Sequence, residues 1–158
     1  MSYWGNEAAG VILFDVASKK FGLGRRSSMV NEPGTLGSFG GAIENGDSPT
    51  ETIENELMEE IGYFYPAELR ELPVFEDTEH GFRYHNFIAA INMSEFKPVM
   101  NWENDGIEWF SFSTLKNSPP GDLHFGVRWL LDQESTFSAM KQIIKKHSPD
   151  AGVELRFG

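Results

Sequence analysis

Hydrophobic residues along this chain follow strand-like spacing in some segments and helix-like spacing in others. Residues 8–14 and 21–25 are short hydrophobic runs separated by polar residues, which predicts a β-hairpin with its turn near residues 17–19. Residues 31–34, Asn-Glu-Pro-Gly, predict a turn. Further strands are expected at residues 69–77, 82–92 and 107–112, a short helix or turn at 113–115, and further helices at 123–131 and around 137–144.

The best-defined element is a helix that begins near Pro49. Ser48 and Glu51 have the spacing of a capping box, and Pro49 occupies the first turn. Gly62 is a typical residue at the end of a helix. Ile53, Leu57 and Ile61 recur every four residues and form a hydrophobic stripe along one side. The last helix of the chain is expected to end at Ser148-Pro149. Strands with helices before and after them suggest a mixed sheet held between helices, in a single domain over residues 1–158.

Composition narrows the possible functions. The chain has no cysteine, which excludes disulfides, zinc–thiolate sites and a cysteine nucleophile. The net charge of −11 argues against nonspecific binding of nucleic acid, because that requires basic surface. Neither a membrane span nor a basic and apolar leader is evident, so a cytoplasmic protein without membrane contact is expected.

The predicted helix carries an unusual concentration of acids. Between Gly40 and Tyr63 there are seven acidic residues and no Lys or Arg. Glu56, Glu59 and Glu60 have i, i+3, i+4 spacing, which places them within a sector of roughly 100° on one helix face. Like charges at this spacing destabilise a helix by about 0.2–0.5 kcal/mol per pair. Because carboxylate oxygens are the ligands that Mg²⁺ and Mn²⁺ prefer, the pattern predicts a metal site.

The spacing of these residues resembles the Nudix box, G-x5-E-x7-R-E-U-x-E-E-x-G-U, where U is a bulky aliphatic residue. Six positions match, and Asp47, Asn55 and Tyr63 depart from the pattern; the matching residues are Gly41, Glu56, Leu57, Glu59, Glu60 and Gly62. The resemblance implies an α/β/α sandwich and metal-dependent hydrolysis of a pyrophosphate bond in a nucleoside diphosphate linked to another group. Asp47 and Asn55 together are interpreted as a replaced supporting pair. The alternative is a nucleotide-binding or regulatory module with little turnover.

The resemblance also implies roles for residues near the box. Mg²⁺, or Mn²⁺ in its place, would be bound by Glu56, Glu59 and Glu60, with the Gly40 carbonyl as a further ligand. Glu103, in the loop before the strand that contains Trp109, is assigned as another metal ligand or as the general base, with Glu108 as its rival. The proton acceptor stays open among Glu59, Glu60 and Glu103.

Residues that would bind the substrate are less sharply indicated. By resemblance, Arg25 and Arg26 lie where similar proteins present a cation to phosphates, although either could be a surface arginine. Phe39 and Tyr84 could stack on a base, although aromatic residues are often core. The expected partner is a small nucleotide, with a homodimer left open. Thr78 and His80 occupy the positions of two substrate markers of the family and match neither, so the substrate class is open.

Overall fold

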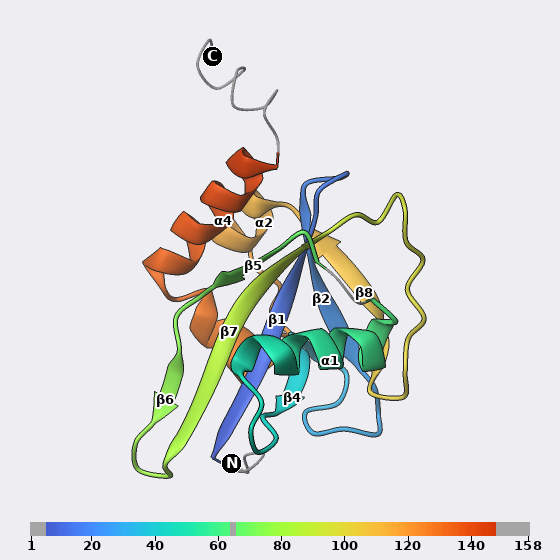
Figure 1. Cartoon of the computed structure of the whole chain (residues 1–158). Helices are drawn as coiled ribbons and strands as arrows, with labels where there is room; N and C mark the ends of the chain where they lie inside the picture. Colours follow the sequence, from blue (N-terminus) through green and yellow to red (C-terminus); the bar gives the residue numbers. More distant parts are fainter. Residues whose placement is uncertain (1–5, 64–65, 148–158) are drawn as a thin grey trace.

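The computed structural model describes residues 6–63 and 66–147. Within these residues eight strands form one mixed sheet, which helices flank (Figure 1). The strands are β1 (Glu7–Asp15), β2 (Lys20–Arg26), β3 (Leu36–Gly37), β4 (Phe39–Ala42), β5 (Glu68–Glu71), β6 (Phe75–Asp77), β7 (Phe82–Ile91) and β8 (Asn104–Phe110). The helices are α1 (Pro49–Ile61), α2 (Phe112–Asn117), α3 (Phe125–Leu130) and α4 (Glu134–Lys146).

Strand β1 lies at the centre of the sheet. It runs parallel to β7 over its whole length, from Glu7 opposite Arg83 to Asp15 opposite Ile91. Its other edge pairs antiparallel with β2 near the hairpin turn and with β4 at the opposite end. Strand β2 pairs with β3 near its end, and pairs with β8 from Phe21 to Arg26. This branching gathers β4, the end of β2 and the start of β8, with the loops after β2 and before β8, beside the amino-terminal half of β1.

Alternate residues of the central strands build two separate cores. Val11 and Leu13 of β1 pack with the hydrophobic stripe of α1. Ile12 and Phe14 face the other way, into a core closed by α2, α3 and α4. The sheet therefore has α1 on one face and the remaining helices on the other, because side chains in a strand alternate between its two faces. The mixed sheet between helices expected from the sequence is confirmed.

The ends of α1 follow the capping signals closely. The Ser48 hydroxyl accepts a hydrogen bond from the Glu51 N–H at 3.1 Å, and the Glu51 carboxylate accepts one from the Ser48 N–H at 3.0 Å. Gly62 adopts a left-handed conformation (φ 80°) and donates to the carbonyls of the last turn. The helix orientation, and with it the acidic face, is thus specified locally.

Three element boundaries differ from the sequence prediction. The strand expected at residues 69–77 is divided into β5 and β6, because Pro73 has no N–H with which to continue the ladder to β7. Strand β8 begins at Asn104 and Phe112 already belongs to α2, whose cap is Ser111. His124 caps α3, so that helix starts later than expected.

The end predicted for the last helix, Ser148-Pro149, lies outside the described residues; α4 is described as far as Lys146. None of the described helices combines the length and the hydrophobicity that crossing a membrane would require.

Candidate functional site

The floor of the site is formed by glycines in β4 and the acidic face of α1. Gly40 lies opposite Gly10 of β1, and a Cβ at Gly40 would lie 2.1 Å from the carbonyl oxygen of Ala9. At Gly41 a Cβ would lie 2.6 Å from a carboxylate oxygen of Glu56. Any larger residue at Gly40 or Gly41 would therefore push the strand from β1 or displace Glu56.

Three glutamates on the acidic face of α1 differ in their exposure. Glu60 is buried, with 2% of its surface exposed, while Glu56 is half-buried and Glu59 is exposed. Burial, together with the charges of Glu59 and Glu103, raises the pKa of Glu56 to about 7. Burial, followed by the charges of Glu103 and Glu56, raises the pKa of Glu60 well above its ordinary value. Ionisation of these two glutamates therefore destabilises the folded state.

Glu103 reaches this cluster from a loop that is fixed to the end of α1. The N–H groups of Val99 and Asn101 donate to the carbonyls of Ile61 and Glu60, at 3.0 and 3.2 Å. These bonds satisfy carbonyls that the helix end leaves without partners. Glu108 instead lies in β8, exposed, with its carboxylate 2.6 Å from Nε of Arg25. The structure thus brings Glu103, and not Glu108, to the glutamates of α1.

A cavity of about 390 Å³ lies over these acids. Its walls come from β4, α1 and the loops after β2 and before β8, and the residues that line it include Gly40, Glu56, Glu59, Glu103, Arg26 and Trp102. The volume lies within the range of about 300–1,000 Å³ that small-molecule sites occupy. The site is therefore large enough for a nucleotide fragment.

Asn104, which the sequence analysis did not single out, also belongs to the site. Its side-chain Nδ2 donates to Oε1 of Glu60 at 3.3 Å, and the residue is buried. A buried carboxylate beside a neutral amide donor is held in a fixed orientation without being neutralised. The only available sequence signal was its position next to Glu103.

The two candidate arginines point to opposite sides of β2. Arg26 lines the cavity, its Nε donates to the carbonyl of Asn31 at 2.7 Å, and burial lowers its pKa. Arg25 pairs with Glu108 and Asp122, which raises its pKa, and also donates to the carbonyl of Gly34 at 2.7 Å. Strand alternation separates the neighbours. The structure therefore does not place Arg25 at the cavity, contrary to the expectation for that residue.

Neither candidate aromatic residue presents its ring to this cavity. Phe39 is fully buried in the core beneath α1, so the structure does not support base stacking on it. Tyr84 covers Gly10, where a Cβ would lie 2.1 Å from the tyrosine hydroxyl, and its hydroxyl lies 3.3 Å from Oγ of Ser38. Burial raises the pKa of Tyr84 to about 12, with the charge of Glu60 contributing in the same direction. Tyr84 therefore packs beside the site as a neutral phenol.

The supposed supporting pair, Asp47 and Asn55, is not joined in the structure. Asp47 lies in the turn before α1, where its N–H donates to the carbonyl of Glu44 at 3.1 Å. Asn55 is exposed on α1. Within residues 6–63 and 66–147 no hydrogen bond links their side chains, so the expected contact is absent and α1 is held by its cap and its hydrophobic stripe.

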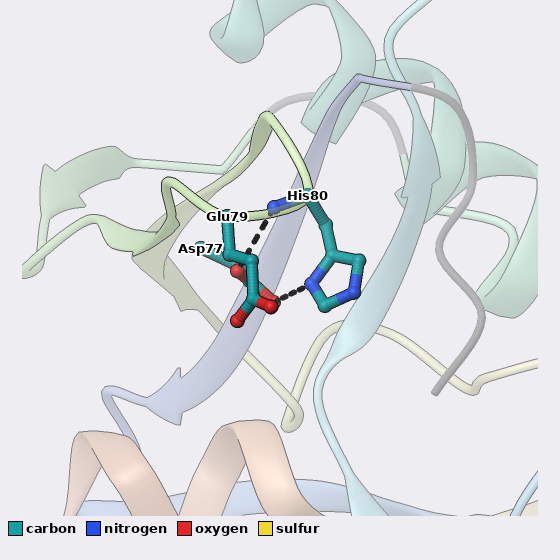
Figure 2. A group of neighbouring side chains, drawn as sticks. All are labelled: Asp77, Glu79 and His80. Carbon is teal, nitrogen blue, oxygen red and sulfur yellow. Dashed lines mark hydrogen bonds and ion pairs between the residues drawn. The ribbon is translucent and has the colours of Figure 1, made fainter.

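A second acidic group lies at the turn between β6 and β7. Asp77, Glu79 and His80 each offer an atom within 4.8 Å of the other two, and of the described residues they alone form such a group (Figure 2). The Asp77 carboxylate accepts from the His80 N–H at 3.2 Å and lies 2.9 Å from its Nδ1. These hydrogen bonds close the turn between β6 and β7. Among the glutamates of the cavity, the side chains of Glu56 and Glu60 interact directly with each other.

The donor set at α1 fits a divalent cation. Oε2 of Glu60 is buried and has no hydrogen-bond partner within the described residues. Buried polar atoms are nearly always satisfied, so a carboxylate oxygen without a partner fits a site that accepts a cation. The close packing of Gly41 against Glu56 keeps a second carboxylate oriented toward the same cavity. Several carboxylates around one space suit Mg²⁺ or Mn²⁺ better than softer metals.

The raised pKa values predict how the metal-free protein responds to pH. The folded state binds protons at Glu56 and Glu60 more tightly than the unfolded chain does, where a glutamate titrates near 4.5. The contribution of Glu56 to the free energy of unfolding should therefore rise as the pH falls through about 7 and level off below about 4.5, and Glu60 acts in the same direction. Urea denaturation in chelator at several pH values measures it.

The matched control for this experiment is Glu60→Gln, which removes one of the two titrating groups. Its stability should depend less on pH than that of the wild type between about pH 8 and 5. Burial lowers the pKa of His124, which acts in the opposite direction in both proteins. Parallel pH profiles for the two proteins would contradict the electrostatic account of the site.

Comparison with known proteins agrees with this geometry. The sequence model of the NUDIX domain matches residues 6–130. A MutT protein from Methanosarcina mazei superposes with a TM-score of 0.63 at 17% identity, over 92% of this chain and 99% of that one. A MutT NUDIX hydrolase from Burkholderia pseudomallei gives a TM-score of 0.60 at 18% identity, over 82% and 97%. A C. elegans Ap4A hydrolase gives 0.56 at 15% identity, over 86% and 94%. At these identities the structural likeness shows the fold alone.

Proposed function

The chain belongs to the Nudix family of pyrophosphohydrolases, and on this premise we propose that it hydrolyses a nucleoside diphosphate linked to a second group, using Mg²⁺. One observation carries the proposal: Glu103 lies beside the glutamates of α1, 43 positions after Glu60, at a cavity that also contains Arg26. A purely structural acidic helix would have no need of another acid from a distant loop. Family members generally use a divalent metal ion, and the choice of Mg²⁺, with Mn²⁺ as a substitute, is part of the proposal.

The cation would be held by Glu56, Glu59 and Glu60, with the Gly40 carbonyl and Glu103 as further candidates. When bound, it neutralises the diphosphate and lowers the pKa of a water molecule. The residues fit this role because burial and the charges of Glu103 and Glu56 raise the pKa of Glu60, and a bound cation would favour its charged form instead.

The chain's own residues would orient the substrate and accept the proton. Arg26 lines the cavity with its guanidinium, which can bind phosphate oxygens in pairs. Water attacks one phosphorus, the bond from that phosphorus to the bridging oxygen breaks, and the electron pair leaves with the second phosphate. The water proton passes to a carboxylate, for which Glu103 is well placed because its backbone is fixed by the Ser27 N–H at 2.9 Å.

The second candidate is a nucleotide-binding module of the same fold with little turnover. The observation that favours it is the absence, within the described part of the chain, of a hydrogen bond between Asp47 and Asn55. Without such a bond the loop before α1 is less restrained, and precise positioning is a large part of phosphoryl-transfer catalysis.

A substrate panel separates the two candidates. We expect the protein with Mg²⁺ to release a nucleoside monophosphate from at least one class of nucleotide. The panel contains nucleotide sugars, dinucleotides, oxidised nucleoside triphosphates and Ap4A, the last because a structural neighbour is an Ap4A hydrolase. Product release is followed by chromatography, with chelator as the blank. Tight nucleotide binding without turnover, at every pH and with either metal, would support the binding module instead.

A further inference from the structure

Two exposed hydrophobic side chains line the cavity that contains the glutamates. Trp102 is 64% exposed and Met29 is 73% exposed, and both line the cavity that contains Glu56, Glu59 and Glu103. Single exposed hydrophobic residues are common on protein surfaces. An indole and a thioether brought to one cavity by loops more than 70 residues apart are less easily explained by chance, since neither contributes to either core.

The backbones that carry these side chains are fixed by one buried serine. The Ser27 hydroxyl donates to the carbonyl of Trp102 at 2.7 Å and accepts from the Met29 N–H at 3.2 Å. The Ser27 N–H donates to the carbonyl of Glu103 at 2.9 Å. Ser27 is only 5% exposed, so these bonds are shielded from water. The backbones of Trp102, Met29 and Glu103 are therefore fixed relative to one another, so that their side chains start from neighbouring points.

The cavity lining combines two kinds of chemistry. Glu56, Glu59 and Glu103 are acidic groups suited to a cation and the diphosphate it carries, and Arg26 lines the same cavity. Trp102 and Met29 add exposed hydrophobic groups to this lining. A ligand that uses both kinds of group joins a diphosphate to a flat hydrophobic ring. Aromatic side chains stack on any nucleobase, because every base has a π-face, and a methionine sulfur makes favourable contacts with rings.

We propose that Trp102 and Met29 form the surface that holds the base of the substrate, and that they determine the preference for substrates that carry a base. This inference rests on the proposed function, since it assumes that the diphosphate lies at the glutamates. Trp102 supplies the stacking face, Met29 supplies an adaptable contact, and Ser27 holds both in register with Glu103. This surface should favour substrates that carry a base over substrates that carry none. The stacking contact itself does not distinguish one base from another.

The test uses uncleavable probes and measures binding by calorimetry in Mg²⁺. The probes are the α,β-methylene diphosphates of adenosine, guanosine, cytidine and uridine, together with ribose bearing the same group and no base. The wild type should bind at least one nucleoside probe about tenfold more tightly than the base-free probe. That ratio corresponds to about 1.4 kcal/mol, within the range measured for stacking of a base on an aromatic residue.

Trp102→Ala should remove this preference and leave the affinity of the base-free probe unchanged. Trp102→Phe should keep most of the preference, and Met29→Ala should reduce it by a smaller factor. Val99→Ala is the matched control, because Val99 is equally exposed at 73% and does not line the cavity. Loss of affinity for all probes alike in Trp102→Ala, or no loss for any, would overturn the inference.

The wild-type data distinguish this inference from the function on which it rests. If the base-free probe binds as tightly as every nucleoside probe, the base surface is wrong and the pyrophosphohydrolase assignment is unaffected. If no probe binds in Mg²⁺, including the base-free one, the proposed diphosphate site and the base surface fail together.

Discussion

Replacing Glu60 by glutamine is expected to lower kcat by about 10²–10³-fold, since the cation it helps to bind contributes several kcal/mol of charge stabilisation. The same change should stabilise the metal-free protein at pH 8, because it removes a buried charge whose neighbours, Glu56 and Glu103, are also acidic. The Asn104 amide can still donate to the glutamine carbonyl, so packing is preserved. Steady-state kinetics and thermal melting with and without Mg²⁺ measure the two effects.

Two further variants on α1 sharpen this experiment. Glu59→Gln should also lower activity, but it should change metal-free stability little because Glu59 is exposed. Glu54→Gln is the control, since Glu54 is exposed on the same helix and does not line the cavity. Mg²⁺ should raise the melting temperature of the wild type more than that of Glu60→Gln. An equal rise in both would argue against a shared metal site.

Glu103→Gln is expected to lower the maximal rate by about 10²–10⁴-fold, the usual scale for removing general acid–base catalysis. The reason is its position: it lies beside Glu56 and Glu60 closely enough to raise the pKa of both. If Glu103 is a metal ligand, the apparent affinity for Mg²⁺ should fall as well. If it acts only as a base, that affinity stays constant and the acid limb of the pH–rate profile changes.

The matched control is Glu108→Gln. Glu108 is exposed and pairs with Arg25, an interaction of the kind that typically contributes about 0–1 kcal/mol to stability and here lies away from the cavity. Its loss should leave the rate nearly unchanged. A near-normal rate for Glu103→Gln together with a large loss for Glu108→Gln would show that the wrong glutamate has been assigned.

Much of the site could be predicted from the sequence because its central element is local. The capping box at Ser48, the stop at Gly62 and the spacing of Glu56, Glu59 and Glu60 all act within one helix, where 3.6 residues per turn relate sequence to direction. The requirement for glycine at Gly41 was also visible, although the structure explains it, through the Glu56 carboxylate that a side chain would meet.

The choices between similar neighbours could not be predicted in this way. Arg25 and Arg26 are adjacent and chemically equal, and only the pairing of β2 with its neighbours turns one toward the cavity and the other toward Asp122. Phe39 was a plausible base-stacking residue until its strand was placed against β1, beneath α1. Sequence patterns report that a side chain alternates, but the sheet decides which face becomes the core and which the site.

The sequence by itself determined the acidic helix and its chemistry, because those depend on contacts between residues no more than four positions apart. The resemblance already pointed to Glu103, but only the tertiary structure decided that Glu103 and not Glu108 lies beside the helix, that Asn104 orients Glu60, and that Ser27 fixes the backbones of Trp102 and Met29 at the cavity. These residues lie in loops whose positions follow from the pairing of β2 with β8 and from the carbonyls at the end of α1. Pairing between strands that are distant in the sequence depends on the fold of the whole chain, and no short segment specifies it.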